Sequence, residues 1–223
     1  MKLWRGDTTN TTNKGYVHEF RTEGIVTKQL LNGDPDYIQR RRLWEAVQDH
    51  VAPCSEAQDY FSATSSFLSF TSSEEAALRF AAGPQRNKLV PCADYEETAV
   101  VFELNLRQMK ETARPHVYIF HYTCNYRLVK PNSPHPSSAR VASLVSCEFC
   151  NSAPKEHTLL LIDVPGYLRA NPNSAARADA LACSERDSEW LVLPVDYVAR
   201  LNGFQSRIPP ADFWRARLFR TAT

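Results

Sequence analysis

Several segments of the chain alternate apolar and polar residues, which is the pattern of strands that bury one face. Residues 98–106 show this clearly, because one side of the segment carries Val100, Phe102, Leu104 and Leu106. Strands are predicted in the same way for residues 1–6, 116–129, 157–164 and 189–194. The polar stretch at 7–15, which follows the first of these strands, is expected to form a loop.

A first helix is predicted from the 3.6-residue spacing of apolar residues before position 53. Asp34 can cap this helix, Pro35 suits its first position, and the helix is expected to end before Pro53. Its predicted apolar face consists of Tyr37, Trp44, Val47 and Val51. The basic run at 40–42 is interpreted as the solvated face of the helix rather than as a phosphate site.

A second helix is predicted to begin at Ser72, which forms a capping-box pattern with Glu75. Its apolar stripe is expected to contain Ala76, Ala77, Phe80 and Ala81. Helices therefore come early in the chain and strands dominate later. This order predicts an α+β fold rather than an alternating parallel one.

Composition limits these predictions without suggesting an activity. A chain of 223 residues, 43% of them hydrophobic, is long enough for one substantial core, so a single domain over 1–223 is predicted. Residues 130–157 are rich in Pro and Ser and are expected to form a loop insertion. The net charge of +1 gives no overall attraction to nucleic acid or membrane, and only 7 glycines argue against a glycine-rich phosphate loop.

Hydrophobic runs and cysteines bear on the cellular compartment. The N-terminal residues show no signal-peptide pattern, and no apolar run approaches the roughly 18 residues of a spanning helix. Six cysteines without a secretion signal fit reduced thiols better than a disulfide framework. We therefore expect a cytoplasmic protein without membrane contact, and delivery into a target cell's cytosol as part of a longer polypeptide stays open.

Cys147 and Cys150 have the spacing of half a zinc site. Zinc needs four ligands, and the remaining candidates, whose spacings match no finger pattern, are Cys124, His135, His157 and Cys183. Free thiols are therefore favoured, with a zinc site at Cys147, Cys150 and Cys124 kept as the weaker alternative.

The C-terminal segment interleaves basic and aromatic residues, namely Arg207, Phe213, Trp214, Arg215, Arg217, Phe219 and Arg220. Such a segment can contact a nucleic acid by charge and stacking. The favoured interpretation is a terminal element whose aromatic side chains dock on the core.

The tripeptide Arg5-Gly6-Asp7 admits three interpretations. An extracellular attachment motif requires an oxidised context and a protruding loop, and the sequence supports neither. Arg5 is otherwise a plain salt-bridge partner at a strand end, or an arginine that binds an anionic substrate. Gly6 is interpreted as a small residue that leaves space for the following loop.

Three stretches together resemble the mono-ADP-ribosyltransferase family, in its cholera- and pertussis-toxin-like branch. The first is the aromatic-Arg-x-Asp pattern at 4–7, followed by an apolar-x-x-Gly-apolar pattern at 20–25. The second is the Ser-rich strand at 67–72 that leads into a helix, similar to the family's Ser-Thr-Ser motif. The third is the acidic-x-Glu pattern at 187–194, which continues into an apolar strand ending in Pro.

The resemblance implies a catalytic domain that transfers ADP-ribose from NAD, as co-substrate, to a macromolecule and releases nicotinamide. Glu189 would stabilise the oxocarbenium-like ribose, Ser69 would orient Glu189, and Thr71 would brace the same strand. Arg5 would bind the pyrophosphate with support from Asp7. The implied fold is a split pair of mostly antiparallel sheets with an NAD cleft and helices on the N-terminal side.

Two positions depart from the family pattern. Phe70 replaces a central Thr whose side chain faces away, so little is lost. Asp187, expected two residues before Glu189 on the same side of an extended segment, stands where relatives that modify arginine usually have Glu and relatives that modify asparagine or DNA usually have Gln. Because this position helps select the acceptor, a protein side chain and a nucleic acid base both stay open. No aromatic residue is matched to the one that stacks on nicotinamide.

The resemblance also implies an intracellular toxin or effector, with an inhibitor or antitoxin protein as a partner. A noncatalytic, zinc-stabilised nucleic-acid-binding module is the alternative from a different class. Simple hydrolysis of NAD, as in an NAD glycohydrolase, is a lesser alternative.

Overall fold

The computed structural model describes residues 1–8, 20, 24–26, 43–51, 67–93, 99–107, 109–112, 114–121, 158–171, 178–195, 207–208 and 211–222. The start of the first predicted helix, the basic run at 40–42 and the insertion at 130–157 lie outside these residues. The zinc candidates Cys124, Cys147 and Cys150 lie outside them as well.

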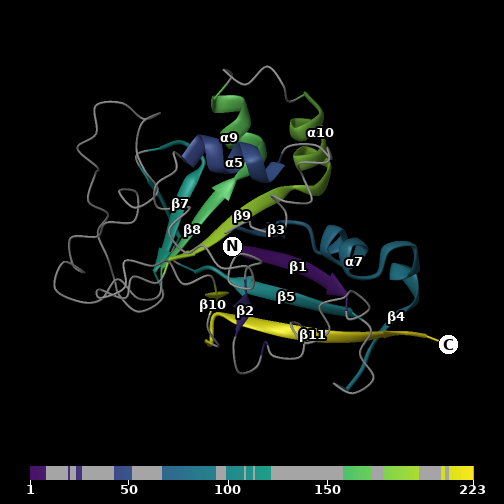
Figure 1. Ribbon diagram of the computed structural model, residues 1–223. Coiled ribbons are helices and arrows are strands. Elements are labelled where there is room, and N and C mark those ends of the chain that lie inside the picture. The colour runs from purple at the N-terminus through teal and green to yellow at the C-terminus, as the bar shows by residue number, and fades with distance from the viewer. Residues whose placement is uncertain are drawn as a thin grey trace.

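The described strands form one antiparallel sheet and a short two-stranded ribbon (Figure 1). The nine strands of the sheet follow the order β4 (Leu89–Pro91), β11 (Trp214–Thr221), β5 (Ala99–Asn105), β1 (Lys2–Thr8), β3 (Leu68–Thr71), β9 (Glu189–Val195), β8 (Thr158–Asp163), β7 (Val117–His121) and β6 (Lys110–Glu111). The ribbon pairs β2 (Ile25–Val26) with β10 (Arg207–Ile208). Together with the helices, this architecture confirms the predicted α+β class.

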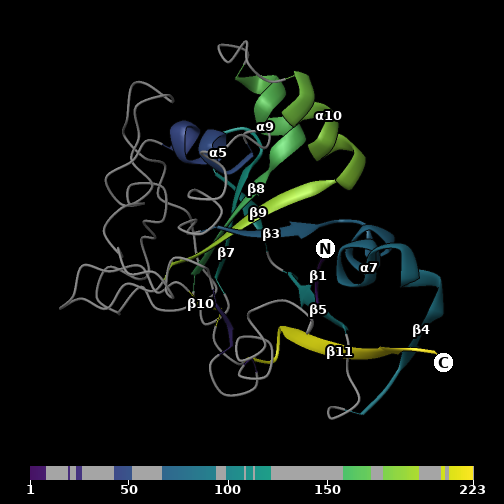
Figure 2. The same cartoon turned by 45° about the vertical axis from the view of Figure 1, so that its right-hand side comes forward.

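The pairing gives one continuous sheet rather than the expected pair of separate sheets. The sheet is narrow at its centre, however, because β1 pairs with β3 only at Trp4 and Thr71, whereas β1 pairs with β5 from Lys2 to Thr8. In Figures 1 and 2, β7, β8 and β9 cross the direction of β1, β5 and β11 steeply. Accumulated strand twist around one short pairing accounts for this change of direction.

Helices cover both halves of the sheet. Three of them, α5 (Leu43–Val51), α9 (Val164–Ala170) and α10 (Ala178–Asp187), lie over β8 and β9, and α7 (Glu74–Ala82) lies beside β1 (Figure 1). The 3₁₀ turn η1 (Gly83–Lys88) follows α7. Buried side chains of α5 and α9 pack against buried residues of β8 and β9, including Leu160, Ile162, Leu191 and Leu193.

The first predicted helix is confirmed where the structure describes it. Val47 is buried in α5, and Trp44 and Val51 are partly buried against the same core. Leu43 and Ala46 also belong to this buried face, although the sequence analysis did not include them.

The second predicted helix needs two corrections. Its N-cap is Ser73, whose hydroxyl accepts a hydrogen bond from Ala76 N, while Ser72 is exposed. Ala76, Ala77 and Ala81 are buried as predicted, but Phe80 is 56% exposed. The fully buried side chains of the helix are therefore all alanines, and the partly buried Leu78 packs beside them.

The two faces of β5 show why alternation predicted this strand only in part. Val100, Phe102, Leu104 and Leu106 are all buried in one cluster, as expected. Ala99 and Val101, on the other face, are also buried, under α7. The strand is therefore buried on both faces rather than half-buried.

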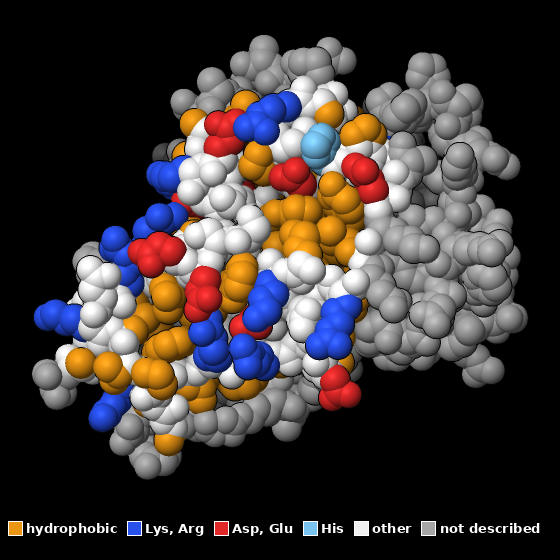
Figure 3. All heavy atoms as spheres, turned by 180° about the vertical axis from the view of Figure 1, so that it is seen from behind, with side chains coloured by type: hydrophobic (Ala, Val, Ile, Leu, Met, Phe, Trp, Pro, Cys, Tyr) orange, Lys and Arg blue, Asp and Glu red, His pale blue; other side chains and the backbone are white. Residues whose placement is uncertain are grey.

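The C-terminal segment is a strand of the sheet, which confirms the favoured interpretation. Trp214 packs on the core cluster around Phe102, and Phe219 packs on the cluster under α7. Arg215 forms an ion pair with the buried Glu103 at 3.0 Å, and Arg217 pairs with Glu74 at 2.6 Å. Seen from behind (Figure 3), basic and acidic side chains stand beside one another over the described part of the visible face.

The described helices include none long and apolar enough to cross a membrane.

Candidate functional site

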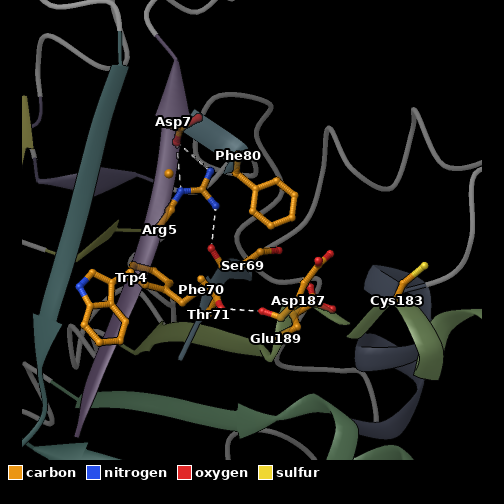
Figure 4. A pocket seen from close by; sticks show the side chains of 11 residues that line it. Trp4, Arg5, Asp7, Ser69, Phe70, Thr71, Phe80, Cys183, Asp187 and Glu189 are labelled. Carbon is orange, nitrogen blue, oxygen red and sulfur yellow. Dashed lines mark hydrogen bonds and ion pairs between the residues drawn. The ribbon is translucent and has the colours of Figure 1, made fainter. Parts of the chain in front are cut away.

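A pocket of about 440 Å³ opens at the narrow centre of the sheet, where β1, β3 and β9 meet α7 and α10 (Figure 4). Its wall includes all six site residues that the sequence predicted, namely Arg5, Asp7, Ser69, Thr71, Asp187 and Glu189. These residues come from three distant parts of the chain, and the order of the strands brings them together.

Arg5 stands on β1 in a fixed orientation. Its Nε and Nη2 both contact Asp7 Oδ2, at 3.1 Å and 3.0 Å, and its Nη1 donates to the carbonyl of Ser69 at 3.0 Å. The carboxylate and the carbonyl hold the planar guanidinium fork at the pocket wall. Both interpretations of Arg5, a substrate-binding arginine and a plain salt-bridge partner, predict its contact with Asp7. Only the substrate-binding interpretation predicts that Arg5 lies in a pocket wall.

Gly6 has a different role from the one that the sequence suggested. Arg5, Gly6 and Asp7 lie within β1, paired with β5, so they form no protruding loop. A Cβ atom at Gly6 would lie 1.8 Å from Ala77 O and 2.7 Å from Ala81 N in α7. Only glycine allows this close approach between strand and helix. The predicted loop from residue 7 is also corrected, because β1 continues to Thr8.

Ser69 connects α5 to the pocket. Its Oγ lies 2.8 Å from His50 Nε2, and the Ser69 hydroxyl also acts to lower the pKa of the Glu189 carboxyl. A serine hydroxyl can donate one hydrogen bond and accept another, so Ser69 can accept a hydrogen bond from an Nε2–H of His50 while its own proton stays available to Glu189. The His50 ring also packs edge-on against Phe67. Phe70, between Ser69 and Thr71 on β3, is buried in the core cluster that contains Phe102, and it also contributes to the pocket wall.

Asp187 lies at the end of a helix, which corrects the predicted extended segment. The next residue, Ser188, has a φ of 48°, and its N–H donates to Glu185 O at 3.1 Å. This left-handed position ends the helix where glycine is more usual. Thr71 Oγ1 donates to the carbonyl of Asp187 at 2.5 Å and accepts from Ser73 N at 2.9 Å. Thr71 therefore joins the helix end, β3 and the start of α7.

The Asp187 carboxylate is bound by two arginines. Arg186 reaches Oδ1 with Nε and Oδ2 with Nη2, both at 3.0 Å, and Arg79 Nη2 contacts Oδ1 from α7. An acidic group at a helix C-terminus faces the negative end of the helix dipole. The two guanidinium groups offset that unfavourable position.

Glu189 begins β9, and Ser184 Oγ donates to its Oε2 at 3.0 Å. Burial raises the pKa of the Glu189 carboxyl above its ordinary value, and the negative charge of Asp187 acts in the same direction. Hydrogen bonds from Ser184 and Ser69 partly oppose this rise, because they favour the ionised form. The site therefore holds an oriented carboxylate whose pKa is raised by its burial.

Five residues of this arrangement were not predicted from the sequence, namely His50, Arg79, Phe80, Ser184 and Arg186. His50 lies in the last turn of a predicted helix, and no short-range pattern connects it with Ser69. Ser184 lies in α10, which the sequence analysis did not predict. The described residues contain no group of three or more potential metal ligands, and Cys183 is an exposed free thiol.

Comparison of the chain with family models, with curated protein sequences and with solved structures gives no match. The interpretation of the site therefore rests on its own residues and geometry.

Proposed function

We propose that this protein is an NAD-dependent mono-ADP-ribosyltransferase, which moves ADP-ribose from NAD to a macromolecular acceptor and releases nicotinamide. One observation carries the proposal. Arg5, Ser69 and Glu189, which lie in three separate sequence motifs, line a single pocket on three different strands.

Glu189 supplies the chemistry that this reaction needs. Cleavage of the nicotinamide–ribose bond places positive charge on the ribose, and a fixed carboxylate stabilises that charge most when it is largest. Ser184 donates a hydrogen bond to the carboxylate at 3.0 Å and the Ser69 hydroxyl favours its ionised form, so the carboxylate is supported before the reaction begins. Ser69 is in turn held by His50 at 2.8 Å, which makes His50 part of the same support.

Arg5 supplies the anion site. The pyrophosphate of NAD carries two negative charges, and a guanidinium binds such oxygens with parallel donors. Asp7 and the Ser69 carbonyl keep the Arg5 fork in place before the substrate arrives. NAD would extend from Arg5 on β1 to Glu189 on β9, across the narrow centre of the sheet.

The place of the pocket at the narrow centre of the sheet also supports the expected split pair of sheets. An ADP-ribosyltransferase-like cleft requires two half-sheets that diverge around the substrate. The single register pair between β1 and β3, with the pocket beside it, is the feature that supports such an arrangement here.

The test is release of nicotinamide from NAD by the purified protein, with and without a cell extract as a source of acceptors. Glu189→Gln should reduce the rate by on the order of 10²–10³-fold, because the substitution removes the charge and keeps the shape. Glu185→Gln is the matched control, since Glu185 is an exposed glutamate of the preceding helix α10 and pairs with Arg169. The control should retain the activity of the unmodified protein.

The products separate the remaining outcomes. Covalent label on a macromolecule supports the transferase, whereas free ADP-ribose alone indicates an NAD glycohydrolase. Absence of nicotinamide release under every condition, or full activity of Glu189→Gln, would overturn the proposal.

A further inference from the structure

We propose, building on the proposed function, that the acceptor of ADP-ribose is a single-stranded nucleic acid and not an arginine side chain. The inference rests on the acceptor side of the pocket, which we define by the pocket-lining Phe80 and Asp187 together with Arg79 and Arg186, the two arginines that bind Asp187. Two of these residues belong to α7 and two to α10, and they meet beside Glu189.

Asp187 is a pocket-lining carboxylate two residues before Glu189, and the guanidinium of an arginine acceptor would bind it there. Both of its oxygens already accept hydrogen bonds from guanidinium groups of this chain, Oδ1 from Arg79 and Arg186 and Oδ2 from Arg186. Its residue is only 9% exposed, so little of the carboxylate faces an incoming ligand. A third guanidinium would meet an occupied carboxylate between two like charges, which is unfavourable.

The same arrangement favours an anion. Two arginines against one aspartate leave the acceptor side with a net positive charge. The Arg186 side chain is 66% exposed and the Arg79 side chain 38%, so both arginines reach solvent beside Asp187, which lines the pocket. Phosphate groups of a nucleic acid backbone are the natural partners of such groups.

Phe80 adds a surface for a base. It is one of two described large hydrophobic residues that are exposed, at 56%, and it lines the pocket. Arg79 Cζ lies 5.7 Å from the centre of its ring. An exposed aromatic ring next to arginines is the combination by which proteins stack an unpaired base while they hold the adjoining phosphates. A paired base keeps its faces covered, so the inference specifies a single strand.

The reaction on such an acceptor balances without a further reagent. The bond between ribose C1′ and the nicotinamide nitrogen breaks, and its electron pair leaves with neutral nicotinamide. A nitrogen lone pair of the base forms the new bond to C1′, and that nitrogen releases one proton to water.

The first experiment supplies the full chain with NAD labelled in its adenosine part and offers single-stranded DNA, single-stranded RNA and an arginine-rich protein separately. Label that nuclease removes and protease leaves supports the inference, and the reactive strand shows whether DNA or RNA is preferred. Label on the protein alone overturns it but leaves the proposed function intact. Nicotinamide release without any transfer also overturns it, and no release at all overturns the proposed function together with the inference.

The second experiment measures binding of a fluorescent single strand at several salt concentrations without NAD, so that no turnover occurs. Each arginine–phosphate contact contributes roughly 0.7 to the slope of log affinity against log salt for a single strand. Arg186→Gln should therefore reduce the slope by about 0.7. Arg86→Gln is the control, because Arg86 pairs with Glu75, whereas Arg186 pairs with the pocket residue Asp187.

The aromatic surface is tested in the same assay. Phe80→Ala should weaken binding of the strand by about tenfold or more, the usual effect of losing one stacked base. Steady-state rates should show a larger increase of KM for the strand than for NAD. If Arg186→Gln leaves the salt slope unchanged, or if Phe80→Ala raises only the KM for NAD, these residues do not bind the acceptor and the inference fails.

Discussion

The two walls of the pocket are built by different means. The Arg5 wall, which consists of Arg5, Gly6 and Asp7 on β1, is held by close backbone packing against α7. The Glu189 wall, which consists of Ser184, Asp187 and Glu189, is held by side-chain hydrogen bonds and ion pairs around a helix end. One wall depends on the absence of a side chain, and the other depends on the presence of several polar ones.

This difference separates two requirements of the proposed reaction. Binding of the pyrophosphate needs a donor at a fixed place, and steric packing supplies a fixed place because interiors tolerate little change of volume. Stabilisation of the ribose cation needs a carboxylate with a suitable pKa, and hydrogen bonds adjust a pKa. Substitutions in the Arg5 wall should therefore reduce folding stability and substrate binding. Substitutions in the Glu189 wall should instead change the pH dependence of the activity.

The largest effect is expected from Gly6→Ala. The added Cβ would meet the backbone of Ala77 and Ala81, which cannot move aside without displacing α7 from the sheet. Overpacking of this kind costs about 3 kcal/mol or more when backbone must shift. Denaturant unfolding should show this loss in the free energy of unfolding.

Gly83→Ala is the comparison that isolates the steric origin. Gly83 follows α7 with a φ of 56°, and nothing lies within 4 Å of an added Cβ. Its cost should come from the backbone conformation alone, about 1–2 kcal/mol. A smaller loss for Gly6→Ala than for Gly83→Ala would contradict the close packing of the Arg5 wall.

An intermediate effect is expected from Arg5→Lys. The substitution keeps the charge but loses the planar fork that contacts Asp7 and the Ser69 carbonyl. Loss of charged hydrogen bonds to the pyrophosphate should raise the KM for NAD by about tenfold or more. Binding can be measured without turnover, because NAD should slow alkylation of Cys183, an exposed thiol in the same pocket.

Arg217→Lys provides the control for that measurement. Arg217 lies in the same sheet and pairs with Glu74, outside the pocket wall. Its substitution should leave both the KM for NAD and the protection of Cys183 unchanged. Unchanged NAD affinity in Arg5→Lys itself would instead favour the plain salt-bridge interpretation of Arg5.

The Arg5 wall was the more predictable from the sequence. The strand that carries Arg5, the neighbouring β5 and the small residues of α7 all follow from short-range periodicity. Alternation nevertheless missed the burial of both faces of β5, because it reports only the more apolar face. The place of Gly6 was also missed, since a close approach between two backbones leaves no periodic signal.

For the Glu189 wall, the sequence predicted Asp187 and Glu189 as site residues but not the helix and the turn that hold them. Helix α10 has no strong apolar stripe, and its described buried residues include Ala180, Ser184 and Asp187. The turn at Ser188 lacks the glycine that usually marks a helix end. Helix α9 did carry a signal, because Asp163 caps it and Pro165 lies in its first turn. Contacts between α5, α7, α10 and β9 depend on tertiary packing, which local patterns do not encode.

The smallest and most specific effect is expected from Ser184→Ala. The hydroxyl of Ser184 favours the ionised form of Glu189, so its removal should raise further a pKa that burial already raises. The reaction needs the carboxylate, and activity is therefore lost as the pH falls through this pKa. The acid limb of the rate of nicotinamide release should move to higher pH by about one unit, the effect of one charged hydrogen bond.

A purely structural role for Ser184 would lower the rate at every pH and leave the acid limb in place. Ser184→Thr keeps the hydroxyl and should restore the original limb even if the added methyl group lowers the overall rate. Thermal stability gives an independent check on the direction of the Glu189 pKa shift. Because burial raises the folded-state pKa of Glu189, its contribution to stability is full below the ordinary pKa and is lost as the pH rises through the raised one. Glu189→Gln, which cannot ionise, should therefore unfold at a higher temperature than the unmodified protein at neutral pH, whereas Ser184→Ala should unfold at a lower one.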